Sequence, residues 1–193
     1  LMSHLGHYLT QGLAEATSLH GVFLEVLGTG VLIKGDAGVG KSELALELIT
    51  RGHRLVADDV VELKHVAPDT LEGSCPSLIR DFLEVRGLGI LNIRFLFGEM
   101  AVKQQKNLKL IVELVQPQEI GEVGLNRLDM VASVETILDV DIPKVHVPVA
   151  AGRNLAVLVE VAVRNHILKH RGVNPLEQFI QRQQAAIDEN GKR

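Results

Sequence analysis

The stretch that decides the fold reads Gly35-Asp36-Ala37-Gly38-Val39-Gly40-Lys41-Ser42. It fits the pattern G-x-x-x-x-G-K-S/T of a Walker A phosphate loop. Its glycines permit backbone angles that a side chain would forbid, so consecutive N–H groups can turn inward around an anion. The stretch therefore predicts nucleotide binding, with Lys41 reaching the β- and γ-phosphates and the Ser42 hydroxyl ligating Mg²⁺.

The residues on both sides of this loop support the same interpretation. The apolar residues 31–33 before it predict a buried strand, and residues 43–49 after it are mostly strong helix formers. Gly52 is placed to end that helix. Glycine-rich turns before helices are common, but here every fixed position is filled and the order is strand, loop and helix, as the motif requires.

Composition limits the fold and the partners. The chain has 193 residues, of which 46% are hydrophobic and only 3% aromatic, so we expect one α/β domain with an aliphatic core, as in parallel-sheet proteins. The net charge of −4, without a basic block, argues against nucleic acid as a partner. No run of apolar residues reaches the ~18 that a membrane helix needs. Cys75 is the only cysteine, which fits a reducing, cytoplasmic location.

Local patterns predict most of the remaining elements. Leu5, Leu9, Leu13 and Ala16 fall on one face of a helix over residues 3–18. Residues 22–27 and 31–34 form a predicted hairpin around Gly28-Thr29-Gly30. Further strands are expected at residues 108–115 and 145–147, a buried helix at 154–170, and an amphipathic helix at 175–190.

Two adjacent carboxylates, Asp58 and Asp59, follow an apolar strand at residues 54–57. A hydrophobic strand that ends in carboxylates beside a phosphate loop is a Walker B arrangement. Adjacent residues at a strand end point different ways, so one carboxylate can face Mg²⁺ and the other the nucleophile. A solvated pair of turn residues is the alternative, and we favour the functional interpretation because a Walker A loop precedes the pair.

A second informative stretch is Glu84-Val85-Arg86-Gly87-Leu88-Gly89-Ile90, which by itself also fits a buried strand and turn with Glu84 and Arg86 paired. Together with four other segments, however, it resembles the HPr kinase/phosphorylase family, in order from about residue 18 to about residue 165. Those segments are His20-Gly21, the phosphate loop, Arg51-Gly52-His53-Arg54-Leu55-Val56-Ala57-Asp58-Asp59, and Pro148-Val149-Ala150-Ala151-Gly152-Arg153-Asn154-Leu155.

The resemblance is to the catalytic C-terminal domain of that family, and it carries several expectations. It implies a P-loop kinase core related to phosphoenolpyruvate carboxykinase and assembled as a homohexamer. Residues 1–193 are expected to form one catalytic domain, with a core at about 18–172 and a C-terminal helix at about 173–190. We do not expect the N-terminal domain that is usual in the family within this sequence.

The resemblance also implies an activity. Members use ATP, and many also pyrophosphate, to phosphorylate a serine of HPr, the phosphocarrier of the sugar phosphotransferase system. The same site runs phosphorolysis, in which inorganic phosphate attacks phosphoserine and yields pyrophosphate. ATP and Mg²⁺ are therefore the expected cofactors, and HPr and inorganic phosphate or pyrophosphate are the expected partners.

Individual residues carry the family's roles. The catalytic histidine, lysine, aspartate and arginine fall on His20, Lys41, Asp59 and Arg127. The Mg²⁺ ligands fall on Ser42 and Glu84, and the Walker B interpretation adds Asp58. The loop associated with dephosphorylation matches Pro148, Val149, Ala150, Ala151, Gly152 and Arg153.

One motif suggests a different class of protein. Asn126-Arg127-Leu128-Asp129 approximates the Asn-Lys-x-Asp guanine motif of GTPases, and a phosphate loop precedes it. A GTPase also needs an Asp-x-x-Gly switch segment, whereas Asp58 and Asp59 are followed by Val60, Val61 and Glu62. A nucleotide-dependent switch or binding module and a small-molecule kinase are the alternatives to a protein-serine kinase/phosphorylase. An assay with labelled ATP and HPr separates them.

Overall fold

The computed structural model describes residues 15–119 and 132–191. Within these ranges the chain forms an α/β structure built around one seven-stranded sheet, in the order β2-β1-β3-β4-β7-β9-β8. Its strands are β1 (Ala16–Val26), β2 (Thr29–Gly35), β3 (Arg54–Ala67), β4 (Thr70–Ser74), β7 (Gln105–Val115), β8 (Ala132–Ile137) and β9 (Val140–Pro148). Because β2 also pairs with β7, the strands β1, β2, β3, β4 and β7 close into a ring.

The sheet is mixed rather than parallel, which corrects the expectation drawn from composition. Only the pairs β2–β7 and β7–β9 are parallel. The other pairings are antiparallel. Short turns join the strands of three of these pairs, β1–β2, β3–β4 and β8–β9. The predicted hairpin is confirmed as β1–β2, and its turn lies at Leu27 and Gly28, both with positive φ.

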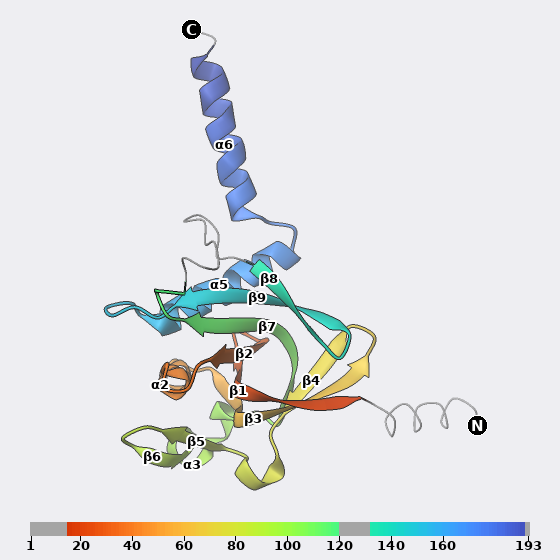
Figure 1. The fold of residues 1–193 in the computed structure, drawn as a ribbon, viewed down its shortest axis with the longest axis vertical. Coiled ribbons are helices and arrows are strands. Elements are labelled where there is room, and N and C mark those ends of the chain that lie inside the picture. The colour runs from red at the N-terminus through yellow and green to blue at the C-terminus, as the bar shows by residue number, and fades with distance from the viewer. Residues whose placement is uncertain (1–14, 120–131, 192–193) are drawn as a thin grey trace, which may run out of the picture.

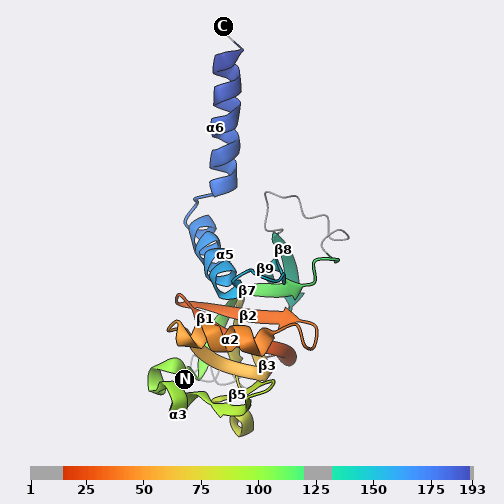
Figure 2. The same cartoon turned by 90° about the vertical axis from the view of Figure 1, so that its left-hand side faces the viewer.

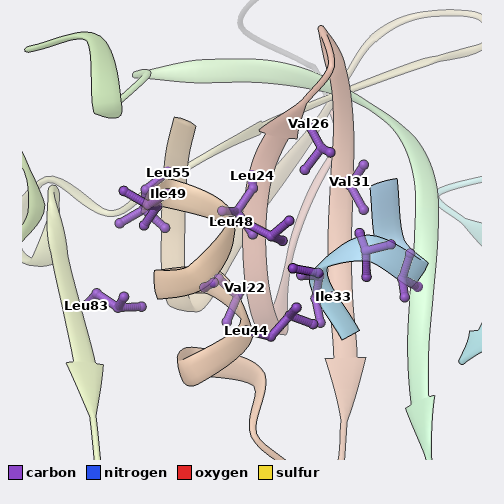
Figure 3. Packing of buried hydrophobic residues seen from close by; sticks show 14 of the residues in the cluster. Val22, Leu24, Val26, Val31, Ile33, Leu44, Leu48, Ile49, Leu55 and Leu83 are labelled. Atoms are coloured by element: carbon purple, nitrogen blue, oxygen red, sulfur yellow. The ribbon is translucent and has the colours of Figure 1, made fainter. Parts of the chain in front are cut away.

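Two apolar clusters form the core, one on each face of the sheet. Val31 and Ile33 belong to the first cluster and Leu32 to the second, as the alternation of a strand requires. The helices α2 (Lys41–Thr50) and α5 (Leu155–His170) cover the first face (Figure 2). Figure 3 shows Leu44 and Leu48 of α2 among the side chains of this cluster. The predicted aliphatic core is confirmed, because Phe23 is the only buried aromatic residue among those described.

Helix α2 ends where Gly52 was expected to end it. The C-cap is Arg51, and Gly52 follows with φ +97°, a left-handed angle that favours glycine. The Gly52 N–H donates to the Ile49 carbonyl, and the His53 N–H donates to the Leu48 carbonyl. These two bonds form a Schellman motif, which fixes the direction of the chain after the helix.

The remaining elements lie at the two ends of the molecule. The hairpin β5 (Phe82–Val85) and β6 (Gly89–Asn92) continues into α3 (Ile93–Phe97), with 3-10 turns η1 (Ser77–Ile79) and η2 (Glu99–Ala101) on either side. At the other end, α6 (Pro175–Asn190) projects away from the sheet (Figure 1). Its bounds match the predicted amphipathic helix at residues 175–190.

Three expectations about elements need correction. Most of the helix predicted at 3–18 lies outside the described residues, but Ala16–Ser18 belong to β1, because the long strand β3 offers them a pairing edge at residues 62–64. The strand before Asp58 and Asp59 does not end there, since β3 continues to Ala67. Helix α5 is present as predicted, yet it buries one face only and leaves Val157 and Val161 exposed.

Candidate active site

A pocket of about 300 Å³ opens beside the N-terminus of α2. The phosphate loop forms one wall, and β1, β3 and the β5–β6 hairpin supply the other. The polar residues that line it are His20, Lys41, Ser42, Glu43, Asp58, Asp59, Glu84 and Arg86. The pocket thus brings together six of the seven catalytic and metal-binding residues predicted from the sequence, and the seventh, Arg127, lies outside the described residues.

The phosphate loop has the backbone that its sequence predicted. Gly35, Gly38 and Gly40 have φ values of 151°, 80° and 100°. Lys41 is 9% exposed, and its ammonium donates to the carbonyls of Gly35 at 2.7 Å and Asp36 at 2.9 Å. The ammonium of Lys41 therefore bonds carbonyls of its own loop, and phosphate oxygens could replace these carbonyls as its acceptors.

The N-terminus of α2 differs from those of the other helices. Asn92, Asn154 and Asn174 cap α3, α5 and α6 with their side chains. The N-cap of α2 is Gly40, and no described side chain caps this helix. Its first N–H groups are thus available to an anion, and the helix dipole favours negative charge at the same point.

His20 and Asp59 form an exposed pair on the opposite wall. His20 Nδ1 lies 3.1 Å from Asp59 Oδ1, and the two side chains are 65% and 69% exposed. Asp59 has φ +67°, a left-handed conformation that is uncommon for a residue with a side chain and that Asp adopts more readily than most. Non-glycine residues held in this conformation cluster at functional sites.

Asp58 makes a different contact from its neighbour. Its Oδ2 accepts the backbone N–H of Glu84 at 3.0 Å, which ties the β5–β6 hairpin to β3. Partial burial raises the pKa of the Asp58 carboxyl, although the N–H groups of Glu84 and Asp59 lower it. The two adjacent carboxylates therefore have different surroundings, as the sequence predicted, and Asp58 also positions the backbone that carries Glu84.

The lining of the pocket is rich in oxygen donors that could hold a divalent metal ion. Its lining carboxylates, Glu43, Asp58, Asp59 and Glu84, outnumber the cations Lys41 and Arg86. Oxygen ligands of this kind suit Mg²⁺, which takes one or two protein carboxylates and otherwise keeps water and phosphate oxygens. No group of three or more metal-ligating His, Cys, Asp or Glu side chains occurs in the described ranges.

The segment 148–153 begins beside the phosphate loop. Gly35 at the end of β2 pairs with Leu114 of β7, and Val115 of β7 pairs with Pro148 at the end of β9. Because these strands are parallel, their carboxyl ends share one edge of the sheet. The two loops therefore start two strands apart, on the order of 10 Å.

Sequence reasoning missed two features of this region. Arg86 lines the pocket, and its guanidinium nitrogens lie less than 4 Å from where a side chain on Gly38 would begin. The stretch around Glu84 had suggested an ion pair with Glu84 instead. Glu160 received no role from the sequence, yet it binds Arg51 and His53 behind the phosphate-loop helix. A charged residue in an otherwise apolar helix face was the available signal.

A phosphate loop that faces carboxylates across a pocket is typical of enzymes that transfer phosphate from a nucleotide. Comparison with known proteins narrows this class. The chain belongs to the HPr Serine kinase C-terminal domain family, whose model matches residues 11–183.

Individual relatives agree with this assignment. The chain is 59% identical over 182 residues to the HPr kinase/phosphorylase of Chromobacterium violaceum, covering 94% of this chain and 57% of that protein. It is 54% identical over 190 residues to the HPr kinase/phosphorylase of Neisseria meningitidis, covering 98% of this chain and 59% of that protein. It therefore spans rather more than half the length of these relatives.

A solved structure confirms the fold. The Hpr(Ser) kinase/phosphatase from Coxiella burnetii superposes with a TM-score of 0.76 at 41% identity, covering 84% of this chain and 98% of that one. Among the helices of residues 15–119 and 132–191, none has the length and apolar character that crossing a membrane requires.

Proposed function

We propose that this chain transfers phosphate from ATP to a serine of the phosphocarrier HPr and, in the same pocket, runs the phosphate-dependent reverse reaction. The observation that carries the proposal is the pocket itself, in a chain of this family. A phosphate loop lies opposite an exposed carboxylate–imidazole pair, so a donor phosphate and a protein hydroxyl can meet between them.

In the kinase direction, the Oγ of the substrate serine attacks the γ-phosphorus of ATP, and the bond to the bridging oxygen breaks to release ADP. Asp59 accepts the serine proton, because its exposed carboxylate faces the pocket. Lys41, freed from the loop carbonyls, neutralises charge on the transferred group. Asp59, rather than Asp58, is the proposed base, since Asp58 is partly buried and holds the Glu84 N–H.

In the reverse direction, an oxygen of inorganic phosphate attacks the phosphorus of phosphoserine. The bond between the serine Oγ and phosphorus breaks, Asp59, which is protonated at the start of this direction, gives its proton to the leaving Oγ, and pyrophosphate forms. Two anions must then lie side by side before they are joined, and their repulsion has to be offset. We assign that task to Arg153 and to backbone N–H groups near Gly152, in the loop that begins beside the phosphate loop. Arg127 is proposed to stabilise the transferred phosphate in both directions.

Mg²⁺ fits the oxygen donors of the pocket, and Ser42, Glu84 and Asp58 would hold it. When bound, it neutralises charge on the phosphates. Several finer features of the family are part of the same proposal: a core related to phosphoenolpyruvate carboxykinase, use of pyrophosphate as a donor, assembly as a homohexamer, and a cytoplasmic location. Light scattering on the purified chain tests the assembly.

In the experiment, the purified chain is incubated with HPr, ATP and Mg²⁺, and the mass of HPr is measured by mass spectrometry. We expect a gain of one phosphoryl group on a serine, reversed on addition of excess inorganic phosphate with release of pyrophosphate. Nucleotide binding without any transfer would support a switch or binding module instead. Transfer to a small molecule but not to HPr would support a small-molecule kinase.

A further inference from the structure

An ionic cluster of buried Glu160, buried His53 and exposed Arg51 joins α5 to the end of α2. Arg51 donates from Nε and Nη2 to the two carboxylate oxygens of Glu160, at 2.8 and 2.7 Å. His53 Nε2 lies 2.7 Å from the same carboxylate, and both His53 and Glu160 are 8% exposed. The hydrogen bonds from Arg51 are the main cause that lowers the pKa of Glu160 to about 2, so this carboxylate is ionised at neutral pH.

The local sequence explains why Arg51 and His53 meet on one carboxylate. Gly52 stands between them with a left-handed φ of 97°. The Schellman motif around it turns the chain sharply at the end of α2. This turn places Arg51 and His53 beside the second turn of α5, where both contact Glu160.

The two helices share a second relationship at their other ends. Helix α2 follows the phosphate loop, which starts at the end of β2, and α5 follows the segment 148–153, which starts at the end of β9. Both strands pair with β7, and the Val149 N–H also donates to the Val115 carbonyl at 2.9 Å. The phosphate loop and the segment 148–153 are therefore both anchored to the sheet through β7. The helices that follow them, α2 and α5, are joined to each other by the Glu160 cluster.

The two helices are not held equally well. Helix α2 buries Leu44, Leu48 and Ile49 in the core. Helix α5 buries mainly smaller side chains, and the residues 151–154 that lead into it are exposed. If the ionic cluster were weakened, we expect α5 and the segment before it to move, while α2 and the phosphate loop stay in place.

We propose that Glu160, Arg51 and His53 are positioning residues that set the distance between the segment 148–153 and the phosphate loop. This inference rests on the proposed function, in which phosphorolysis needs both loops while phosphorylation by ATP needs mainly the phosphate loop. Weakening the cluster should therefore impair the reaction with inorganic phosphate more than the reaction with ATP. A displacement of about 1 Å in such a site can cost on the order of 100-fold in rate.

The test compares Glu160→Gln and Arg51→Lys with the control Glu25→Gln. Glu25 on β1 is a matched carboxylate, 14% exposed and bound to Lys106 at 2.8 Å. For both cluster variants we expect a rise in KM for inorganic phosphate and a loss of phosphorolysis on the order of 10-fold or more. The rate with ATP should change by less than about 3-fold, and Glu25→Gln should alter the two directions equally.

A second readout does not depend on activity. Trypsin cleavage after Arg153, followed by mass spectrometry under native conditions, reports whether the segment 148–153 has come loose. We expect faster cleavage in both cluster variants than in Glu25→Gln. Arg51→Lys keeps a positive charge beside the buried Glu160 carboxylate. If Glu160→Gln does not fold, Arg51→Lys is the variant to compare with Glu25→Gln.

The outcomes separate the two proposals. Absence of any transfer by the unaltered chain would refute the proposed function, while the cleavage rates would still judge the positioning role. Equal loss in both directions, in proportion to the fall in melting temperature and with cleavage as in the control, would overturn the inference and leave the cluster a purely structural one.

Discussion

Replacement of Lys41 by methionine tests the phosphate loop most directly. Methionine keeps the length and apolar stem of the side chain but removes the ammonium that now bonds the carbonyls of Gly35 and Asp36. The bound nucleotide then loses the mobile cation that would neutralise its terminal phosphates. We expect the variant to lose phosphoryl transfer and most of its stabilisation by nucleotide.

The loss of nucleotide-dependent stabilisation in Lys41→Met follows from the energy of the lost contact. Nucleotide at 100 times its Kd stabilises a protein by about 2.7 kcal/mol. For a chain of 193 residues, this corresponds to a rise in Tm of roughly 5–11 °C. Loss of one charge-assisted contact costs about 1.5–3 kcal/mol of binding. At the same nucleotide concentration the stabilisation then falls to about 0.3–1.3 kcal/mol, so the rise in Tm should be at least halved.

The assay is thermal unfolding with and without Mg²⁺ and a non-hydrolysable ATP analogue. Lys34→Met is the matched control. Lys34 lies at the end of β2, directly before the phosphate loop, is 23% exposed, and forms an ion pair with Glu135 at 2.8 Å. We expect this control to melt earlier than the unaltered chain but to keep the full shift with nucleotide. A full shift in Lys41→Met would refute the assignment of this loop to phosphate binding.

Two further predictions concern charge. Arg153→Ala should lower phosphorolysis of phosphoserine-HPr more than phosphorylation by ATP, measured as initial rates on one preparation; equal loss in both would remove the special role of this loop. Glu160 has its pKa lowered from 4.5 to about 2, so it contributes about 3 kcal/mol of stability above pH 4.5 that disappears as the pH falls towards 2. Urea unfolding should show the difference from Glu160→Gln shrinking on acidification, and a constant difference would contradict this.

Short-range signals in the sequence predicted the parts of the fold that short-range physics determines. The phosphate loop, the end of α2 at Gly52 and the bounds of α6 all depend on residues within a turn or two of one another. The resemblance of several motifs, in order along the chain, to those of a known family then identified residues that line the pocket. Those motifs could place His20 and Asp59 in one site, although 39 positions separate their numbers in the sequence.

Long-range pairing is what the sequence did not predict. The run of β3 past Asp59 depends on an edge offered by β1, and the mixed direction of the sheet depends on which strands become neighbours. The Glu160 cluster joins residues more than 100 positions apart, and periodicity carries no information about such a partner. The intrinsic propensity of residues favours a helix or a strand, whereas tertiary contacts decide how long that element is and which strands pair with it.

The continuation of β3 gives the conformation of Asp59 a physical reason. Ala57, Val61 and Leu63 all face the second core cluster, so regular alternation would point the carboxylate of Asp59 into the same apolar interior. Its left-handed φ of 67° leaves the side chain 69% exposed and beside His20 instead. The site therefore depends on a left-handed backbone at this residue, a conformation that costs most side chains about 1–2 kcal/mol and that Asp and Asn adopt more readily.

That conformation predicts an inverted order of stability at position 59. In an ordinary strand, glycine is less stable than alanine by roughly 0.5–1 kcal/mol, whereas a left-handed position favours glycine. Asp59→Gly should therefore melt above Asp59→Ala, while Glu62→Gly, at an exposed position of the same strand, should melt below Glu62→Ala. Asp59→Asn tolerates the left-handed angle, so it should keep near-native stability and lose about 10²–10⁴ in transfer rate. If Asp59→Ala melts above Asp59→Gly, the carboxylate is not held by backbone strain, and its exposure must have another cause.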